Sequence, residues 1–326
     1  MTEPEHHRVV IVGAGFGGIG ASIKLAAEGV EHVILEKSDE VGGTWWANRY
    51  PGCRCDVPSH LYSFSFALNP DWSDSYSLQP EIWRYLRKVA EEHGVVERVR
   101  FGCKVDSARW DDAGKRWRLE TSEGPISGDV LIAANGFLSE PAIPHFDGIE
   151  NFAGEVMHSA QWDPSYDVTG KRVAIIGTGA SAVQIVPRVH EDAEHLFVFQ
   201  RTAAWILPHR GRPIRDWERA LYRRAPLAQR RLSEDELATA RLDLGAQARA
   251  DRHAADQPAR QGDAVQRGRR RRRLAHLRQH ALRAARQLLD RPALGAHHRL
   301  AFRARAVLRP GEADARRRAE PAAHTR

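Results

Sequence analysis

The sequence predicts an α/β protein built around two similar strand–turn–helix–strand units, the second in an incomplete domain, followed by an Arg- and Ala-rich tail of low order. Three observations support this prediction. Buried runs of β-branched residues alternate with helical patterns up to about Tyr222. Two of these runs lead directly into glycine-rich turns, and the composition changes abruptly after Tyr222. We therefore expect domains over residues 1–150 and 151–222 and a tail over 223–326.

The first glycine turn has the parts of a dinucleotide-binding βαβ unit. The strand RVVIV runs into the turn GAGFGG, and a helical stretch then leads to a second strand that ends at Glu36. Gly13 permits the tight turn, Gly15 lets the backbone approach a pyrophosphate, and Gly18 allows close helix–sheet packing. A glycine triplet alone also fits a structural turn, but Glu36 stands where an acid accepts hydrogen bonds from ribose hydroxyls and repels a 2′-phosphate. We expect a Rossmann-like domain that binds FAD.

The second glycine turn repeats the pattern with a different charge. The strand KRVAII precedes Gly177 and Gly179, and the third glycine is replaced by Ala182. The next strand ends in Gln-Arg-Thr without an acid, which places Arg201 where a guanidinium pairs with the 2′-phosphate of NADPH. The alternative for Arg201 is a surface arginine at a strand end. Sites for FAD and NADPH together imply hydride transfer from nicotinamide to flavin.

The tail differs from the rest of the chain in charge and composition. Residues 1–222 hold 23 Lys+Arg and 31 Asp+Glu, a balance of −8, whereas residues 223–326 hold 26 Arg and 11 acids, a balance of +15. From Arg223 onward there is no Lys, Ile, Asn, Trp or Tyr, and Phe302 is the only aromatic residue. Such a segment has little apolar surface to bury, so we expect it to be disordered or loosely helical.

Two explanations of the tail stay open. An Arg-rich tail can bind nucleic acid non-specifically through phosphates. Alternatively, the reading frame shifted near residues 223–232 in GC-rich coding DNA, and the simultaneous loss of five residue types favours this explanation. No motif for groove recognition is visible, so we otherwise expect no nucleic-acid partner.

Cysteine usage and hydropathy indicate the cellular compartment and whether the chain binds metal or a membrane. Cys53, Cys55 and Cys103 are too few for a disulfide framework and lack the second pair of a zinc site, so we expect reduced thiols and no metal. No apolar stretch approaches the roughly 18 residues that span a membrane, and the N-terminus is short and polar. These features predict a soluble cytoplasmic protein without a membrane partner.

Two further motifs resemble the fingerprints of one enzyme family. Residues 42–56, GGTWWANRYPGCRCD, hold a Gly, a Trp two places on, an aromatic-Pro-Gly and an Asp at fixed spacing, and residues 152–163, FAGEVMHSAQWD, fit FxGxxxHxxxW followed by Pro or Asp. Both resemble the Baeyer-Villiger monooxygenases, which are class B flavoprotein monooxygenases. The related N- and S-oxidising enzymes usually depart at the end of the second motif, so Trp162-Asp163 favours the Baeyer-Villiger type. The resemblance covers residues 8 to about 222.

The resemblance implies roles for particular residues. Those that would line FAD are Thr44, Trp45, Asp56, Tyr62 and Val105, and those that would hold NADPH, beside its glycines, are Ser181, Arg201 and Thr202. Arg54 and Asp56 would lie where flavin and nicotinamide meet, although a carboxylate after a Pro-Gly turn can also simply cap that turn. His158 would couple movements of the two domains rather than act as an acid or base. The alternative for His158 is a linker histidine that hydrogen-bonds to the backbone.

The resemblance also implies an activity. NADPH would reduce FAD, and the reduced flavin would use dioxygen to insert oxygen next to a ketone carbonyl, giving an ester or lactone. The alternatives are an N- or S-oxidising flavin monooxygenase, an NADPH oxidase, and a nucleic-acid-binding protein whose nucleotide folds act as a redox sensor. The family's arginine that approaches the flavin, its substrate domain and its C-terminal strand have no visible counterpart in the tail. We therefore expect this chain to be truncated, and to be poorly folded or inactive.

Overall fold

The computed structural model describes residues 4–138, 140–201, 209 and 211–232, all within one unit that spans Met1–Leu289. The expectations for the tail beyond residue 232 lie outside the described residues. In chain order the elements are β1 (Glu5–Val12), α1 (Phe16–Ala27), β2 (Val33–Leu35), α2 (Thr44–Ala47), α3 (Gln79–Glu92), η1 (Val96–Arg98), β3 (Val99–Arg100), β4 (Val105–Asp111), β5 (Arg116–Thr121), β6 (Ile126–Ala133), η2 (Ile149–Asn151), η3 (Ser159–Gln161), β7 (Arg172–Ile176), α4 (Ala180–Asp192), β8 (His195–Phe199) and α5 (Asp216–Arg224).

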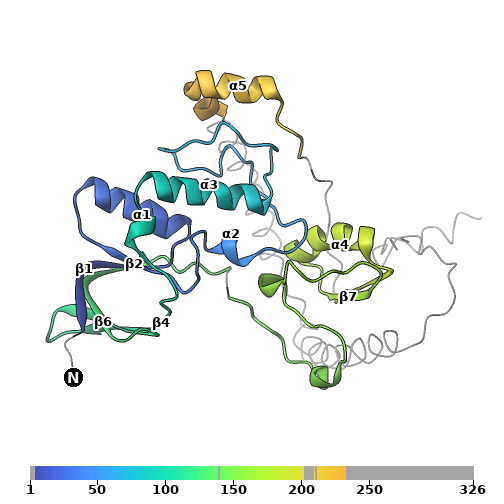
Figure 1. Ribbon diagram of the computed structural model, residues 1–326, viewed down its shortest axis with the longest axis horizontal. Coiled ribbons are helices and arrows are strands. Elements are labelled where there is room, and N and C mark those ends of the chain that lie inside the picture. The colour runs from blue at the N-terminus through green and yellow to red at the C-terminus, as the bar shows by residue number, and fades with distance from the viewer. Residues whose placement is uncertain (1–3, 139, 202–208, 210, 233–326) are drawn as a thin grey trace, which may run out of the picture. The chain divides into compact units, whose positions relative to one another are not determined.

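The part of the chain predicted as the first domain contains a six-stranded mixed sheet in the order β3-β2-β1-β6-β5-β4 (Figure 1). Strands β3, β2, β1 and β6 are parallel, whereas β5 runs antiparallel to both β6 and β4. The short turn between β4 and β5 permits that reversal, because the Asp111 carboxylate accepts from the backbone N–H groups of Ala113 and Gly114, each at 3.1 Å. The predicted α/β architecture is confirmed, with an antiparallel extension at one edge.

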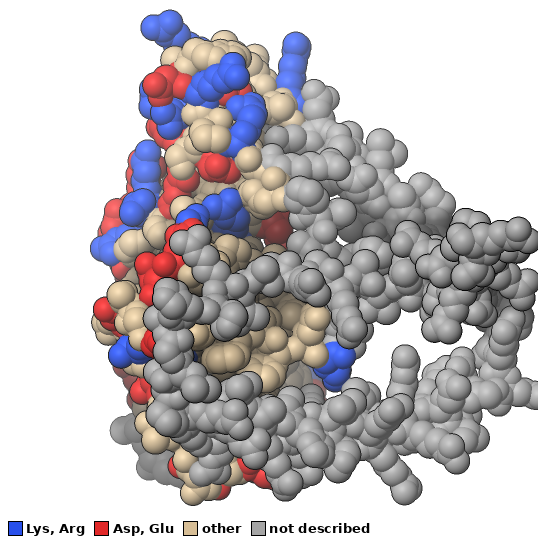
Figure 2. All heavy atoms as spheres, turned by 90° about the vertical axis from the view of Figure 1, so that its right-hand side faces the viewer, with Lys and Arg blue, Asp and Glu red and all other residues tan. Residues whose placement is uncertain are grey.

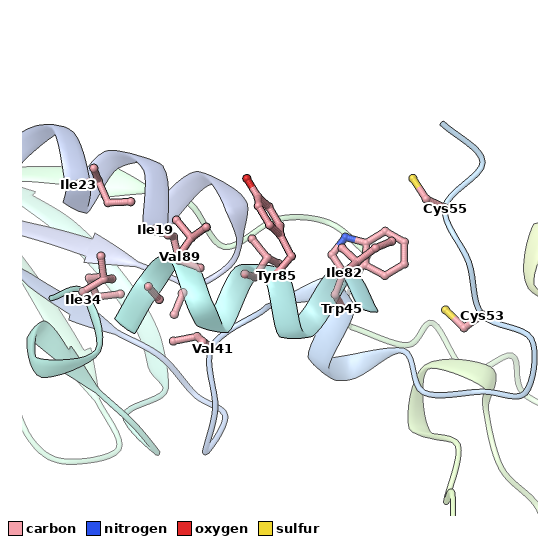
Figure 3. Packing of buried hydrophobic residues seen from close by; sticks show 14 of the residues in the cluster. Ile19, Ile23, Ile34, Val41, Trp45, Cys53, Cys55, Ile82, Tyr85 and Val89 are labelled. Carbon is pink, nitrogen blue, oxygen red and sulfur yellow. The ribbon is translucent and has the colours of Figure 1, made fainter. Parts of the chain in front are cut away.

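Alternation along β1 and β2 divides the core between the two faces of the sheet. Val9, Ile11 and Ile34 pack with helices α1 and α3 on one face. Figure 3 shows Ile19 of α1 and Val89 of α3 in the same cluster. Val10, Val33 and Leu35 point to the other face, where they pack with Leu119 of β5. Both central strands are therefore buried on both sides, which explains their continuous apolar sequences.

The second glycine turn lies in a smaller strand–helix–strand unit. Strands β7 and β8 pair in parallel, with Ala174 opposite Phe197, and α4 connects them. Ile185 and Val189 of α4 are buried in the same hydrophobic cluster as Ile11 of the first domain. Both predicted strand–turn–helix–strand units are therefore confirmed.

Residues 211–232 run back along the first domain. The N–H of Ile214 donates to the carbonyl of Ser73 at 2.9 Å, and the Nε2 of Gln229, which is buried, donates to the carbonyl of Asn69 at 2.7 Å. The change in amino-acid composition after Tyr222 falls inside α5. The composition therefore changes before the described fold ends.

Charged residues of both signs are interspersed on the face shown in Figure 2. Lys and Arg lie among Asp and Glu there, in keeping with the slightly acidic balance of residues 1–222.

An ion pair in the first turn of α5 makes the stability of the fold depend on pH. Arg212 donates to both carboxylate oxygens of Glu218, at 2.8 and 2.7 Å, and the backbone N–H of Arg215 donates to the same group at 2.9 Å. The Arg212 hydrogen bonds hold the pKa of Glu218 at about 2. A carboxyl with a depressed folded-state pKa stabilises the fold above its unfolded pKa of about 4.3 and loses that contribution as pH falls through the folded value.

We therefore expect Glu218→Gln to flatten the fall in stability between about pH 4.3 and 2, because the variant has no proton to take up there. Urea midpoints measured across this range would show the change. Glu191→Gln, on exposed α4 surface, serves as the control and should keep the wild-type slope. Equal slopes in wild type and Glu218→Gln would contradict the assignment.

Candidate dinucleotide sites

A cavity of about 370 Å³ lies where the carboxyl ends of β1, β2 and β6 meet. In open α/β sheets this crevice is the usual place of a bound nucleotide, because loops and helix N-termini converge there. Its lining includes seven of the residues predicted for FAD, namely Gly13, Gly15, Glu36, Thr44, Trp45, Tyr62 and Val105. The structure thus brings together residues that are up to 92 positions apart in the sequence, from Gly13 to Val105.

The glycine turn presents unsatisfied backbone donors to this cavity. Helix α1 begins after Gly15, which provides no side-chain cap, and its first turn holds no acidic residue. Its first N–H groups therefore have no partner within the helix, which suits a phosphate anion. Gly13 has φ +101°, and a Cβ there would lie 2.7 Å from the carbonyl oxygen of Ala134. Only glycine fits this turn.

Close backbone contact extends to the neighbouring glycines. A Cβ on Gly43 would lie 2.9 Å from the Cα of Gly15, so the two glycine loops are in direct backbone contact at the edge of the cavity that both line. A Cβ on Gly18 would lie 1.9 Å from the carbonyl oxygen of Gly13. Gly18 therefore packs the helix onto the turn, as its position in the motif predicts.

Glu36 has a structural role that its position in the motif did not reveal. Its Oε2 accepts from the N–H of Ala14 at 2.7 Å, and its Oε1 accepts from the N–H of Ser38 at 2.9 Å. The side chain is 5% exposed and lines the cavity. Each carboxylate oxygen has a further lone pair, so Glu36 can hold the glycine turn and still accept a ribose hydroxyl.

Trp45 and Tyr62 form one aromatic wall of the cavity. The indole Nε1 of Trp45 donates to the Tyr62 hydroxyl at 3.0 Å, and their rings meet edge to face with centroids 5.5 Å apart. Burial raises the pKa of the Tyr62 hydroxyl. The ring of Phe16 packs against Tyr62 at 4.9 Å. This wall shields that side of the cavity from water.

Arg54 and Asp56 are not among the residues that line this cavity. The Asp56 side chain is exposed, and the Nη1 of Arg54 lies 3.5 Å from the Nε2 of His209. Both residues follow a turn in which Tyr50 and Cys53 are buried. Their roles at the meeting point of flavin and nicotinamide stay predictions.

The second glycine turn has a similar local geometry. Gly177 has φ +119° after β7, and Gly179 caps α4 without a side-chain hydrogen bond or an acid in the first turn. Ser181 lies in that first turn, and Arg201 is exposed just beyond β8. Thr202 lies outside the described residues. The parts needed to hold a second pyrophosphate are therefore present, with a cation beyond the second strand.

His158 has a local hydrogen-bonding role. Its Nδ1 accepts from the N–H of Ala160 at 3.1 Å and caps the short helix η3. This is the backbone contact that we gave as the alternative for a linker histidine. A role in domain movement stays a prediction.

Three further expectations concern the cysteines, metal ions and membranes. Cys53, Cys55 and Cys103 are free thiols in the structure, and all three are buried. In the described part of the chain, no three His, Cys, Asp or Glu side chains are grouped so as to hold a metal ion. No helix within the described ranges is long and apolar enough to cross a bilayer.

Comparison with known proteins places the chain in a family. Residues 6–238 match the family described as flavin-binding monooxygenase-like. The chain is 50% identical over 223 residues to a Baeyer-Villiger monooxygenase of Streptomyces coelicolor, covering 68% of this chain and 43% of that protein. Among solved structures it is similar to an oxidised steroid monooxygenase bound to NADP, with a TM-score of 0.65, 41% identity and coverage of 70% and 45% of the two chains.

A second solved structure, OTEMO in complex with FAD and NADP, matches with a TM-score of 0.63 and 36% identity, covering 68% of this chain and 44% of that one. The chain thus spans less than half the length of these relatives. The match extends 16 residues past Tyr222, to residue 238, and so includes the α5 region. With the family matching more than half of its length, this chain belongs to the flavin-binding monooxygenase-like family.

Proposed function

We propose that the described residues form the cofactor-binding part of a Baeyer-Villiger-type monooxygenase, with FAD in the cavity and NADPH at the second glycine turn. The observation that carries the proposal is the cavity itself, which joins an uncapped helix N-terminus, Glu36 and an aromatic wall in one crevice. The names of the similar proteins, which include a Baeyer-Villiger monooxygenase and complexes with FAD and NADP, support the same assignment. In the whole protein the substrates would be a ketone and dioxygen, and the product an ester or lactone.

The residues present fit these cofactors. FAD, when bound, supplies a carrier that takes hydride from NADPH and reacts with dioxygen. The first N–H groups of α1 would bind the pyrophosphate, and Glu36, which lines the cavity, would accept hydrogen bonds from the ribose hydroxyls. Trp45 and Tyr62 exclude water from the other side of the cavity. Arg201 pairs with the 2′-phosphate of NADPH.

The visible spectrum of the purified 326-residue chain tests this proposal. We expect oxidised-flavin absorption after addition of FAD, and bleaching after anaerobic addition of NADPH. Protein that takes up no FAD would overturn the proposal. Product analysis with a ketone, an amine and a sulfide, together with a hydrogen peroxide assay, distinguishes Baeyer-Villiger chemistry from N- or S-oxidation and from NADPH oxidase activity.

The composition of residues 223–326 leads to a separate expectation. Because no counterpart of the family's arginine that approaches the flavin is visible there, we propose that the 326-residue chain binds cofactor without completing the oxygen insertion. Ketone-dependent NADPH consumption by the purified chain would contradict this. We also propose a cytoplasmic location, which the three free thiols support, since such thiols are typical of reducing compartments.

Arg201 should determine the preference for NADPH over NADH. We expect Arg201→Gln to weaken NADPH binding about 10- to 100-fold, because a bidentate charge-assisted pair with the 2′-phosphate is lost. NADH binding should stay unchanged, because NADH has no such phosphate. Titrations that follow flavin bleaching with each nucleotide would measure both effects. Arg109→Gln, on exposed β4 surface, should change neither, and equal losses for NADPH and NADH in Arg201→Gln would contradict the role.

A further inference from the structure

The side chain of Gln184 forms hydrogen bonds with the loop that contains Arg54 and Asp56. Its Oε1 accepts from the Tyr50 hydroxyl at 3.0 Å and from the backbone N–H of Arg54 at 3.2 Å, and its Nε2 donates to the carbonyl of Arg54 at 3.1 Å. One amide thus pairs with both backbone groups of a single residue. The three hydrogen bonds join helix α4, in the second strand–turn–helix–strand unit, to the loop that contains Tyr50 and Arg54. These residues lie 134 and 130 positions before Gln184 in the sequence.

The loop and the helix are also in close backbone contact at this point. Gly52 has φ +77°, and a Cβ there would lie 2.6 Å from the carbonyl oxygen of Gln184 and 3.0 Å from the Cγ of Arg188. Tyr50 is 9% exposed. The opposite side of the loop is held by the N–H of Gln79, which donates to the carbonyl of Cys53 at 2.8 Å. The loop is therefore fixed from two sides, and on the α4 side Gln184 provides three of the hydrogen bonds, beside a further hydrogen bond between Tyr50 and Ser181.

We propose that Gln184 is a positioning residue that holds the loop of residues 50–56 against α4 and so sets Arg54 and Asp56 relative to the NADPH-binding turn. The consequence for cofactor chemistry rests on the proposed function, whereas the docking of the loop does not. The same helix carries Gly179 and Ser181 at its N-terminus. The loop that carries Arg54 and Asp56, which we predict to lie beside the flavin, is thus attached to α4, the helix that we propose binds the nicotinamide nucleotide.

An amide at position 184 is needed because the contact uses a donor and an acceptor together. A methionine has a similar length but makes none of the three hydrogen bonds. A glutamate keeps the acceptor for Tyr50 and for the N–H of Arg54, but it cannot donate to the carbonyl of Arg54 when ionised. Gln184→Met should therefore release the loop further than Gln184→Glu.

Two cysteines in the loop report on its docking without any cofactor. Cys53 and Cys55 are 5% and 3% exposed, and Figure 3 shows both on the loop that follows Trp45. Burial raises the pKa of each thiol to about 11, so both react slowly while the loop is docked. Cys103 is fully buried in the separate cluster on the other face of the sheet and reports on general unfolding.

The test is the rate of labelling of each cysteine in the full chain by a thiol reagent, with the labelled sites identified by mass spectrometry. We expect Gln184→Met to raise the labelling rates of Cys53 and Cys55 about tenfold, since the loss of several hydrogen bonds raises the open population of the loop. The rate for Cys103 should not change. Gln184→Glu should fall between wild type and Gln184→Met. Gln161→Met, the same change on an exposed residue, should behave as wild type.

A second readout concerns the cofactors. We expect the affinity of Gln184→Met for FAD to be unchanged, because Gln184 does not line the FAD cavity, and the rate of flavin bleaching by NADPH to fall. Unchanged labelling of Cys53 and Cys55 in Gln184→Met would overturn the proposal. Equal acceleration of Cys103 in both Gln184 variants would overturn it too, by showing a general loss of stability. Chain that binds no FAD would refute the proposed function and leave the labelling result to decide the docking role.

Discussion

Gly18→Ala is expected to lower the free energy of unfolding by about 3 kcal/mol or more, because the new methyl group has no space. A Cβ at this position would lie 1.9 Å from the carbonyl oxygen of Gly13, which is backbone and cannot rotate away. Helix α1 would have to move off the glycine turn, and the first N–H groups of the helix would leave the cavity. Urea unfolding of the full chain, followed by far-UV circular dichroism, measures the loss.

Gly17→Ala is the matched control for this prediction. A Cβ on Gly17 would lie 3.5 Å from the Cβ of Ala134, an ordinary contact, and Gly17 lies in the first turn of α1. Replacing glycine by alanine inside a helix stabilises it by about 0.5–1 kcal/mol. Gly17→Ala should therefore be as stable as wild type or more stable. Equal destabilisation of the two variants would show that the Gly13–Gly18 contact is not the cause.

Glu36→Gln is expected to weaken FAD binding about 10- to 100-fold, since hydrogen bonds to a charged group each contribute about 1.5–3 kcal/mol. The N–H groups of Ala14 and Ser38 donate to different oxygens of Glu36, and glutamine replaces one of those oxygens with an NH2 group, which cannot accept. One backbone N–H in the turn then loses its partner, and the ribose loses an anionic acceptor. The change thus affects the shape of the turn as well as the contact with the ribose.

Titration of flavin fluorescence against apoprotein measures this affinity. Glu31→Gln, an exposed residue just before β2, carries the same change of charge and should bind FAD as wild type does. Equal weakening in both variants would assign the effect to net charge and would contradict a specific role for Glu36.

Local patterns were sufficient to predict the two strand–turn–helix–strand units. The β-branched runs of β1 and β7 and the glycines after them determine their conformation within a few residues. The cavity residues around Thr44 and Trp45 came from the resemblance of residues 42–56 to a family motif, and the structure places them in the cavity.

Other features depend on contacts between distant segments and have no local signature. Strand β4 is mostly exposed and has no apolar alternation, so its sequence, VDSARWD, does not indicate a strand. The hydrogen bonds from Gln184 to Arg54 and from Gln229 to Asn69 join residues 130 and 160 positions apart. A polar side chain gives no indication of such a partner in the sequence, because the same residue on a surface looks identical.

The pairing of β1 with β6 also constrains how the chain reaches its fold. Strand β1 comes first among the described strands, yet one of its two neighbours in the sheet is β6. Paired residues of the two strands are 121 positions apart in the sequence. During synthesis β1 can pair with β2 early, but its other edge stays open until residues 126–133 have left the ribosome. Folding of this sheet therefore waits for a contact of large sequence separation, which makes it slow. A nascent chain halted before β6 would expose an apolar strand edge that invites pairing with other chains.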